Sequence, residues 1–414
     1  MRVLGRLLQY ALPVTACLLT CSPVRAQWGM NDVTIIYPLP DHSAEAAELI
    51  SPQEPGLGGA WLPQKLYVRL PEINQGEAKD DTYRNLRVVA IRLDPCFRNE
   101  GSCLPQVRLV WQPVSTSNYG STASSGQLEA KDAAIHSFYT LEPVAFQSLM
   151  NDYERLRKQC ARDLSTEPLR VHPVIAEQGL DGPFAQGLKR LLDKYVGTKT
   201  LWRITAMKTF VGSDQWAFQG FNVRDGSTQD IPIPRTRGAT QQDFRTAQVT
   251  QTDFSNGMVS PAPQGSDNLL PILQNSRFLR GEDPAFLSTL GKAVANIENP
   301  KVHTPETMDC VSCHAAQAAG SVLFERIAGL GELPQVMAGR FRSALPLQNL
   351  GLRQGNTHML RALGYVDRDL VLSRRVINET ANVAERLNRE AQDAAAARLA
   401  NLRKPDGRLD FTAL

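Results

Sequence analysis

The sequence predicts an α+β protein in two parts, a mixed α+β domain at residues 27–235 followed by a mostly α-helical domain at residues 267–414. Runs of β-branched and aromatic residues, which are typical of strands, alternate with helical patterns in the first part. Residues 236–266 are dominated by Gln, Thr, Ser, Gly and Pro, as in a linker or long loop. From Asn268 onward, apolar residues recur at helical spacing.

Length and charge narrow the classes of function. The chain has 414 residues, with 45 basic and 42 acidic side chains and a net charge of +3. This balance argues against a polyanionic partner. No basic stripe with interleaved aromatic residues occurs, so we expect no nucleic-acid binding.

The first 26 residues have the pattern of a secretory signal peptide. Arg2 and Arg6 give a positive start, residues 7–20 are mostly apolar, and Val24-Arg25-Ala26 offers small residues for cleavage. The apolar stretch is too short to remain as a membrane-spanning helix. We therefore expect export to the periplasm of a bacterium.

A second interpretation of the same segment ends in a membrane anchor. Val14-Thr15-Ala16-Cys17 is similar to a bacterial lipobox, and residues 18–21 are a poorer version. Lipidation at Cys17 would tether the mature protein to a membrane through its N-terminus. The sequence leaves a soluble periplasmic protein and a lipoprotein both open.

The first strands surround a pair of cysteines. Residues 33–37 and 65–70 read as strands, and so do residues 86–93 and 107–111, which form a hairpin. Cys96 and Cys103 lie at its closing end. In an exported protein we expect them to form a disulfide, worth about 2–3 kcal/mol for so short a loop. The alternative is two buried free thiols, and Cys160 is left over as a buried thiol.

Helices and strands then alternate to the end of the first part. Residues 143–161 and 183–195 have helical spacing, and residues 201–211 and 215–223 read as two strands. In the second part, Phe286, Leu290, Ala293 and Ile297 form one apolar helix face. Residues 372–402 form a last, long amphipathic helix.

One short run carries specific chemistry, namely Cys310-Val311-Ser312-Cys313-His314. A Cys-x-x-Cys-His run is the pattern of covalent haem attachment. The two intervening residues allow both thiols to meet one edge of the porphyrin and add to its vinyl groups. The histidine that follows folds under the macrocycle to reach the iron. The run follows an extended segment with two prolines, at residues 299–309, and begins a predicted helix.

This run resembles the haem-attachment site of the c-type cytochromes, a resemblance confined to residues 310–314 and their helical setting. It implies one covalently bound haem c, with Cys310 and Cys313 as thioether sites and His314 as the proximal iron ligand. It also implies single-electron transfer with a redox partner protein that the sequence does not identify. We expect an electron carrier more than a catalyst.

The resemblance calls for a sixth iron ligand, usually a methionine on a later loop. Met359 has the more familiar separation from His314, and Met337 is the other methionine considered. His358 and His303 compete with them. The sequence does not decide among these residues, and each has an ordinary structural interpretation as well.

Two other interpretations stay open. Cys310, Cys313, His314 and His303 supply enough donors for a structural zinc ion in an exported binding or surface protein. Cys310 and Cys313 could also form a disulfide. An enzyme site in the first part has no recognisable motif, and we interpret His136 and His172 there as structural or exposed histidines.

Overall fold

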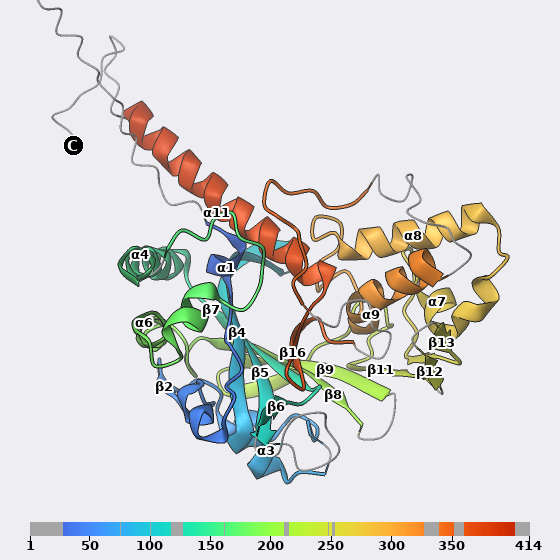
Figure 1. Ribbon diagram of the computed structural model, residues 1–414, viewed down its shortest axis with the longest axis horizontal. Coiled ribbons are helices and arrows are strands. Elements are labelled where there is room, and N and C mark those ends of the chain that lie inside the picture. Colours follow the sequence, from blue (N-terminus) through green and yellow to red (C-terminus); the bar gives the residue numbers. More distant parts are fainter. Residues whose placement is uncertain are drawn as a thin grey trace, which may run out of the picture.

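The framework of the fold is one large antiparallel sheet (Figure 1). The computed structural model describes residues 28–401 except 75, 100, 117–126, 161, 211–214, 247, 251–252, 327–338 and 352–359. Ten strands form the sheet, along the path β1-β4-β5-β7-β8-β9-β11-β14, with β6 paired to β5 and β10 to β9. These strands are β1 (Thr34–Ile36), β4 (Leu86–Asn99), β5 (Ser102–Thr116), β6 (Leu128–Ala130), β7 (Ala134–Thr140), β8 (Leu201–Thr209), β9 (Gln215–Arg224), β10 (Ser227–Asp230), β11 (Gln241–Arg245) and β14 (Met258–Ser260).

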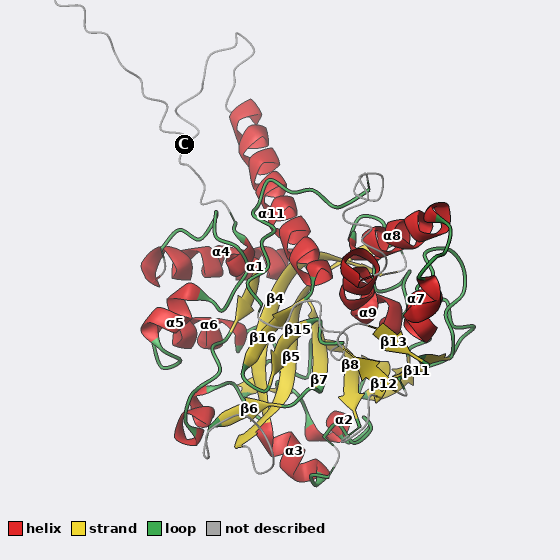
Figure 2. Cartoon of the chain, turned by 45° about the vertical axis from the view of Figure 1, so that its right-hand side comes forward, coloured by secondary structure: helices red, strands yellow, loops and turns green. Residues whose placement is uncertain are grey.

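Helices gather at the two ends of this sheet, with α4, α5 and α6 at one end and α7, α8 and α9 at the other (Figure 2). The long helix α11 runs over strand β4 between the two groups. The helices are α1 (Met30–Val33), α2 (Gln64–Tyr67), α3 (Lys79–Asn85), α4 (Pro143–Cys160), α5 (Pro173–Gln178), α6 (Pro183–Leu192), α7 (Leu270–Asn275), α8 (Pro284–Glu298), α9 (Cys310–Ser321) and α11 (Arg374–Asn401). Shorter elements are the 3₁₀ turns at Ser43–Glu48 and Ser276–Leu279, the π turn at Val322–Arg326, and the hairpins β2 (Pro55–Gly56) with β3 (Gly59–Ala60), β12 (Gln248–Thr250) with β13 (Asp253–Ser255), and β15 (Leu363–Val366) with β16 (Asp369–Leu372).

The predicted fold class is wrong in its second part. The chain after residue 267 is not a mostly α-helical domain of its own, because its helices cover the ten-stranded sheet. One apolar cluster joins α8 and α9 to Phe218 of β9 and Phe244 of β11. Helical periodicity shows that a helix buries one face, but it does not show what that face packs against.

The other apolar cluster links the two ends of the described chain. It runs from Trp28 to Leu387 and includes Ile377 of α11. Trp28 and Asn388 exchange hydrogen bonds of 2.7 and 3.0 Å, and the hydroxyls of Thr34 and Thr380 lie 3.0 Å apart. Helix α11 is therefore part of the core around the first strands.

Local predictions met mixed outcomes. Helices α4 and α6 confirm the expected helical stretches at residues 143–161 and 183–195. The strand expected at residues 65–70 is wrong, because helix α2 begins after Pro63 and buries Leu66 and Tyr67, and a turn that follows it buries Leu70. Residues 236–266, expected as a linker, contribute β11 to the sheet, where Gln242 and Phe244 are buried.

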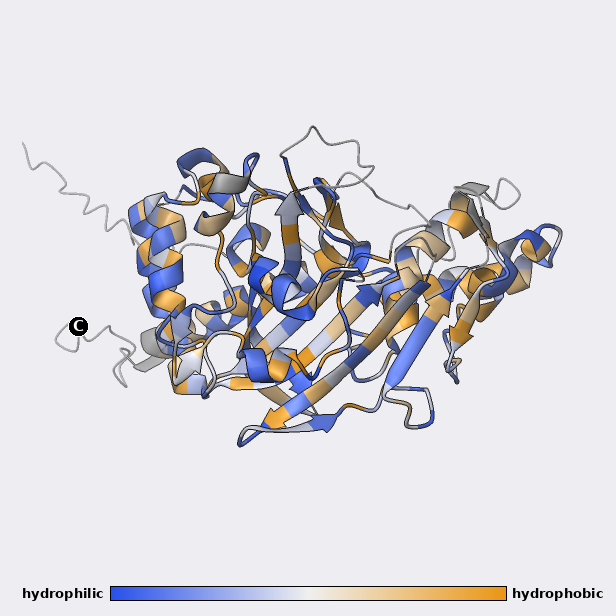
Figure 3. Cartoon of the chain, turned by 90° about the horizontal axis from the view of Figure 1, so that it is seen from below, coloured by the Kyte–Doolittle hydropathy of each residue, from blue (hydrophilic) through white to orange (hydrophobic). Residues whose placement is uncertain are grey.

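Alternation along the strands gives the sheet two different faces (Figure 3). On β7, Ile135 and Tyr139 belong to the apolar cluster that contains Trp28, whereas His136 and Phe138 lie on the opposite face. The hairpin of β4 and β5 is closed by a disulfide between Cys96 and Cys103, whose Cα atoms are 4.4 Å apart. Among the described helices, none is long and apolar enough to span a membrane.

Candidate functional site

Helix α9 begins in a buried, hydrogen-bonded setting. Asp309, the residue before the helix, accepts a hydrogen bond from the backbone N–H of Ser312 at 3.0 Å. Gln242 of β11 accepts one from the backbone N–H of Val311 at 3.0 Å, and its amide nitrogen donates to Asp309 at 2.9 Å. Asp309, Gln242 and Ser312 are all buried, so these hydrogen bonds hold the start of α9 against the sheet.

The three motif residues share one face of this first turn and line one pocket. Cys310 and His314 are four residues apart, and Cys313 is three residues from Cys310. Both thiols are free and partly buried. Burial raises the pKa of Cys310 to about 12 and that of Cys313 to about 11, so both are neutral thiols at neutral pH.

The orientation of His314 fixes its tautomer. Its Nδ1 lies 2.6 Å from the backbone oxygen of Leu360. A carbonyl oxygen only accepts, so Nδ1 must carry the proton. Burial, as the main cause, lowers the pKa of His314 to about 4, and the ring is neutral at neutral pH. The lone pair therefore resides on Nε2, and the Phe218 ring packs 4.8 Å from the imidazole.

The sheet supplies the wall that faces the motif. Side chains of directly paired residues share a face, and the pocket is lined by three such rows across β7, β8 and β9. The rows are Ala134 with Met207 and Phe218, His136 with Thr205 and Gly220, and Phe138 with Arg203 and Asn222, of which all but Asn222 line the pocket. The pocket holds about 1230 Å³, counting the part that is open to solvent.

The sequence analysis interprets His136 as structural or exposed, but the structure places it in the lining of this pocket. It lies in the middle row of this wall, on β7, and it lines the same pocket as His314. Burial first, and then Arg108 and His314, holds the pKa of His136 well below its usual range. A signal was present in the sequence, because the alternation of β7 places His136 on the same face as Phe138 and opposite the core residues.

A cluster of arginines lines the same pocket. Arg108, Arg203, Arg361 and Arg375 all contribute to it, against the acidic residues Asp309 and Glu379. Arg361 is paired with Asp132 at 2.9 Å, and Arg375 with Glu379 at 2.6 Å. Burial alone would raise the pKa of Glu379, but Arg375, Arg92 and Arg108 outweigh it and hold the pKa well below its usual range.

Of the other predicted site residues, the structure describes only some. Met337, His358, Met359 and Cys17 fall outside the described residues. His303 does not line the pocket, and its Nε2 lies 2.9 Å from Asp267. Met308 and Met207 do line it, but the Met308 sulfur is engaged by Arg235 at 2.7 Å.

The zinc interpretation finds no support in the described part of the chain. No group of three or more His, Cys, Asp or Glu side chains there is arranged to hold a metal ion. Because His303 is bonded to Asp267 away from the pocket, it does not complete a set with Cys310, Cys313 and His314.

The residues of the pocket fit a haem c. Both thiols and His314 line one cavity, and a histidine that binds a metal commonly donates its other ring N–H to a backbone carbonyl, as Nδ1 does here. Phe138, Phe218 and the prolines of residues 231–234 offer apolar surface, while the arginines offer partners for carboxylates. Comparison with protein-family models, curated proteins and solved structures finds no match.

Proposed function

We propose that this chain is a mono-haem c-type protein that carries single electrons. The haem is attached through Cys310 and Cys313, and His314 binds the iron through Nε2. The observation that carries the proposal is the hydrogen bond from His314 Nδ1 to the Leu360 carbonyl, in a pocket lined by both thiols. Bound haem supplies an iron that cycles between the ferric and ferrous states.

The chain's own residues perform the remaining tasks. Cys310 and Cys313 would hold the haem, because each thiol S–H would add across one vinyl double bond, forming an S–C and a C–H bond and releasing nothing. The Leu360 carbonyl orients the His314 ring, and Phe218 packs against it. The buried start of α9 holds both sulfurs at one edge of the pocket.

If haem is bound there, His136 would be the candidate among the described residues to hold the iron together with His314, because both histidines line the pocket. It is the histidine of the sheet wall, and it lines the same pocket as His314. In the described part of the chain, no hydrogen bond engages its side chain. Ligation by two histidines gives a lower reduction potential than ligation by histidine and methionine.

The test of covalent haem is a reduced pyridine haemochrome spectrum of denatured protein that has been exported with the haem-attachment machinery. The wild type and Cys160→Ser, a control that alters a free thiol outside the pocket, should both show a c-type α-band. Cys310→Ser/Cys313→Ser should lose it. A wild type without covalent haem would contradict the proposal, and zinc analysis of that sample would then test the metal alternative.

Export and a lipid tether remain part of the proposal. The disulfide of Cys96 and Cys103 suits an oxidising compartment such as the periplasm. We expect fractionation to place the protein in the periplasm or on a membrane. Loss of membrane association in Cys17→Ser would support a lipoprotein, and unchanged lipid labelling of that variant would exclude Cys17 as the anchor.

A further inference from the structure

A second cleft lies beside the haem pocket and is strongly basic. It is formed by the disulfide end of the β4–β5 hairpin, residues 300–305 and helix α11, and it holds about 1110 Å³, counting the part that is open to solvent. Seven of its lining residues are basic and two are acidic. The basic residues are Arg92, Arg98, Arg108, Lys301, Arg375, Arg386 and Arg389, and the acidic residues are Asp94 and Glu379.

The inner part of the cleft contains three guanidinium groups around one carboxylate, and two of them, Arg92 and Arg375, are buried. Arg92 and Arg108 are directly opposite each other on β4 and β5, an arrangement of like charges that is unfavourable by itself. Glu379 of α11 offsets it, at 2.7 Å from Arg92 and 3.8 Å from Arg108. Arg375 bonds the same carboxylate at 2.6 Å. One carboxylate thus serves three arginines, so the inner part keeps an excess of positive charge.

Their other bonds hold these groups in place. Arg92 also donates to Thr34, Thr380 and the carbonyl of Val376, at 2.8 to 3.2 Å. Arg375 donates to the carbonyls of Ile297 and His303 at 2.9 and 2.8 Å. By contrast, Nε of Arg108 is buried and has no acceptor in the described structure. A buried donor without an acceptor is costly, and an anionic oxygen in the cleft would offset that cost.

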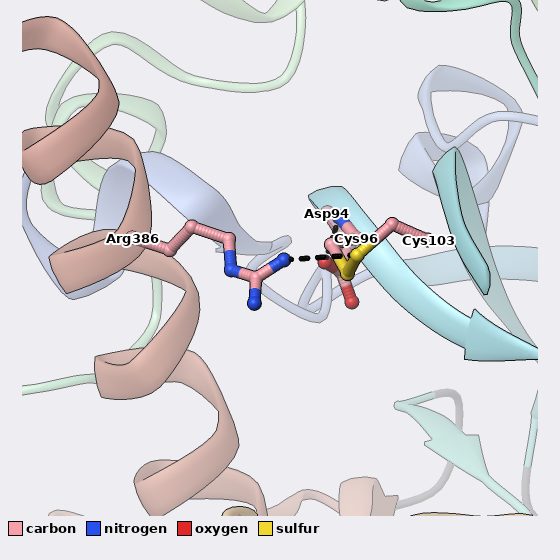
Figure 4. The surroundings of a disulfide bond; sticks show 4 residues. All are labelled: Asp94, Cys96, Cys103 and Arg386. Atoms are coloured by element: carbon pink, nitrogen blue, oxygen red, sulfur yellow. Dashed lines mark hydrogen bonds between the residues drawn. A yellow bond between two sulfur atoms is a disulfide. The ribbon is translucent and has the colours of Figure 1, made fainter. Parts of the chain in front are cut away.

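The outer part of the cleft includes one cation, Arg386, that has a weak hydrogen-bond partner. Arg386 reaches from α11 to the disulfide, where it donates to the sulfur of Cys103 at 3.2 Å (Figure 4). Sulfur is a weak acceptor, so this guanidinium keeps most of its capacity to bind an oxyanion. The acidic neighbours are Glu390, close to Arg386, and Asp94, whose carboxylate already accepts from the backbone N–H of Cys96 at 2.9 Å.

We propose that this basic cleft binds a small ligand with two or more anionic oxygens, such as inorganic phosphate or a short dicarboxylate. The excess of guanidinium groups calls for more than one negative charge. Concavity favours a small molecule, because Arg92 and Arg375 are too deeply buried for an acidic protein surface to reach. The site is separate from the proposed haem function, although Arg108, Arg375 and Glu379 line both cavities.

The experiment is a calorimetric titration of the full mature chain with inorganic phosphate and with succinate, at constant ionic strength set with chloride. The haem-free variant Cys310→Ser/Cys313→Ser serves as background, so failure of haem attachment does not affect the result. We expect saturable binding. Adding Arg98→Gln/Arg386→Gln should weaken it about tenfold or more, since two charge-assisted donors are lost.

The control variant is Arg224→Gln, which removes an exposed cation outside both cavities and should bind like the background protein. Absence of saturable binding for either probe would overturn the proposal, and so would equal affinities in the double and control variants. Haem-loaded wild type distinguishes a free anion from the haem carboxylates. Phosphate binding that persists in the haem-loaded protein supports the cleft site. Loss of phosphate binding in the haem-loaded protein would assign the arginines of the cleft to the haem carboxylates and overturn the proposal.

Discussion

His136 and His314 come from distant parts of the chain, yet both line the same cavity as neutral imidazoles. A neutral ring offers one nitrogen lone pair, and on His314 that lone pair lies on Nε2 because Nδ1 donates to Leu360. Two half-buried, neutral imidazoles thus line one cavity, which is the arrangement on which the proposed binding of one iron by both rings rests.

Replacement of His136 by alanine should therefore open one side of the haem iron. We expect the haem-loaded wild type to be low-spin, His136→Ala to be high-spin, and added imidazole to restore the low-spin absorption spectrum of the variant. His303→Ala, which alters a histidine bonded to Asp267 outside the pocket, should keep the wild-type spectrum. A low-spin His136→Ala without imidazole would show that another residue, such as Met359, occupies that side.

A fully buried histidine, His172, predicts how the free energy of unfolding depends on pH. His172 is stacked on Phe184 at 4.7 Å, and burial, as the main cause, lowers its pKa to about 3. The unfolded chain takes up this proton near pH 6.5, whereas the folded protein does not. Stability is therefore fully present above about pH 6.5 and falls as the pH falls toward 3, by about 1.4 kcal/mol per pH unit.

Urea unfolding at pH 7 and pH 5 checks whether the free energy of unfolding falls with falling pH, as predicted. His172→Asn retains an oxygen that can accept from Ile175 N–H, as His172 Nδ1 does at 3.4 Å, but it does not titrate. Between pH 7 and pH 5, the free energy of unfolding of the variant should fall by about 2 kcal/mol less than that of the wild type. His42→Asn, an exposed control, should lose as much as the wild type. A fall in the free energy of unfolding of His172→Asn that equals or exceeds that of the wild type would contradict this prediction.

At the scale of the element, the start of α9 determines where both thiols stand. Asp309 is fully buried and joins the first turn to Gln242 of β11. Asp283 occupies the same position before α8, but it is exposed and accepts a single bond from Ala285 at 3.2 Å. The two helix starts therefore form a matched pair, one tied to the sheet and one in solvent.

Asp309→Ala should cost about 2–3 kcal/mol of unfolding free energy, because it removes the cap and leaves the buried amide of Gln242 without that acceptor. Asp283→Ala should cost about 1 kcal/mol or less. Denaturant unfolding measures both, and the yield of covalent haem should fall only for Asp309→Ala. Equal costs for the two variants would show that the link to the sheet adds nothing.

At the scale of the whole molecule, both apolar clusters pack on one continuous sheet. Ile377 of α11 belongs to the cluster that contains Trp28, and Leu290 of α8 belongs to the other. Because β8 contributes residues to both clusters, neither one has a framework of its own. We expect the described part of the chain to unfold as one cooperative unit.

Ile377→Ala and Leu290→Ala should each lower the unfolding free energy by about 2–5 kcal/mol and shift the same transition. Tryptophan fluorescence and far-ultraviolet circular dichroism should report coincident curves for both variants. Phe278→Ala, at a side chain that is 76% exposed, should change stability little. Two separate transitions, each affected by only one variant, would contradict a single cooperative unit.

The sequence by itself determined the features that depend on residues close together in the chain. The spacing of Cys310, Cys313 and His314 within one helical turn is of this kind, and so are the pairing of Cys96 with Cys103 and the periodicity of α4 and α6. Local steric rules and short loops govern these features, so a linear pattern contains them.

Only the tertiary structure decided which distant residues meet. The order and register of the strands bring His136 to the cavity of His314, and they place Arg92 and Arg108 beneath Glu379. The fold class was predicted wrongly for the same reason, because the periodicity of α8 and α11 contains no information about the sheet that they cover. Side-chain patterns record that a face is buried, whereas the partner of that face is set by the packing of the whole chain.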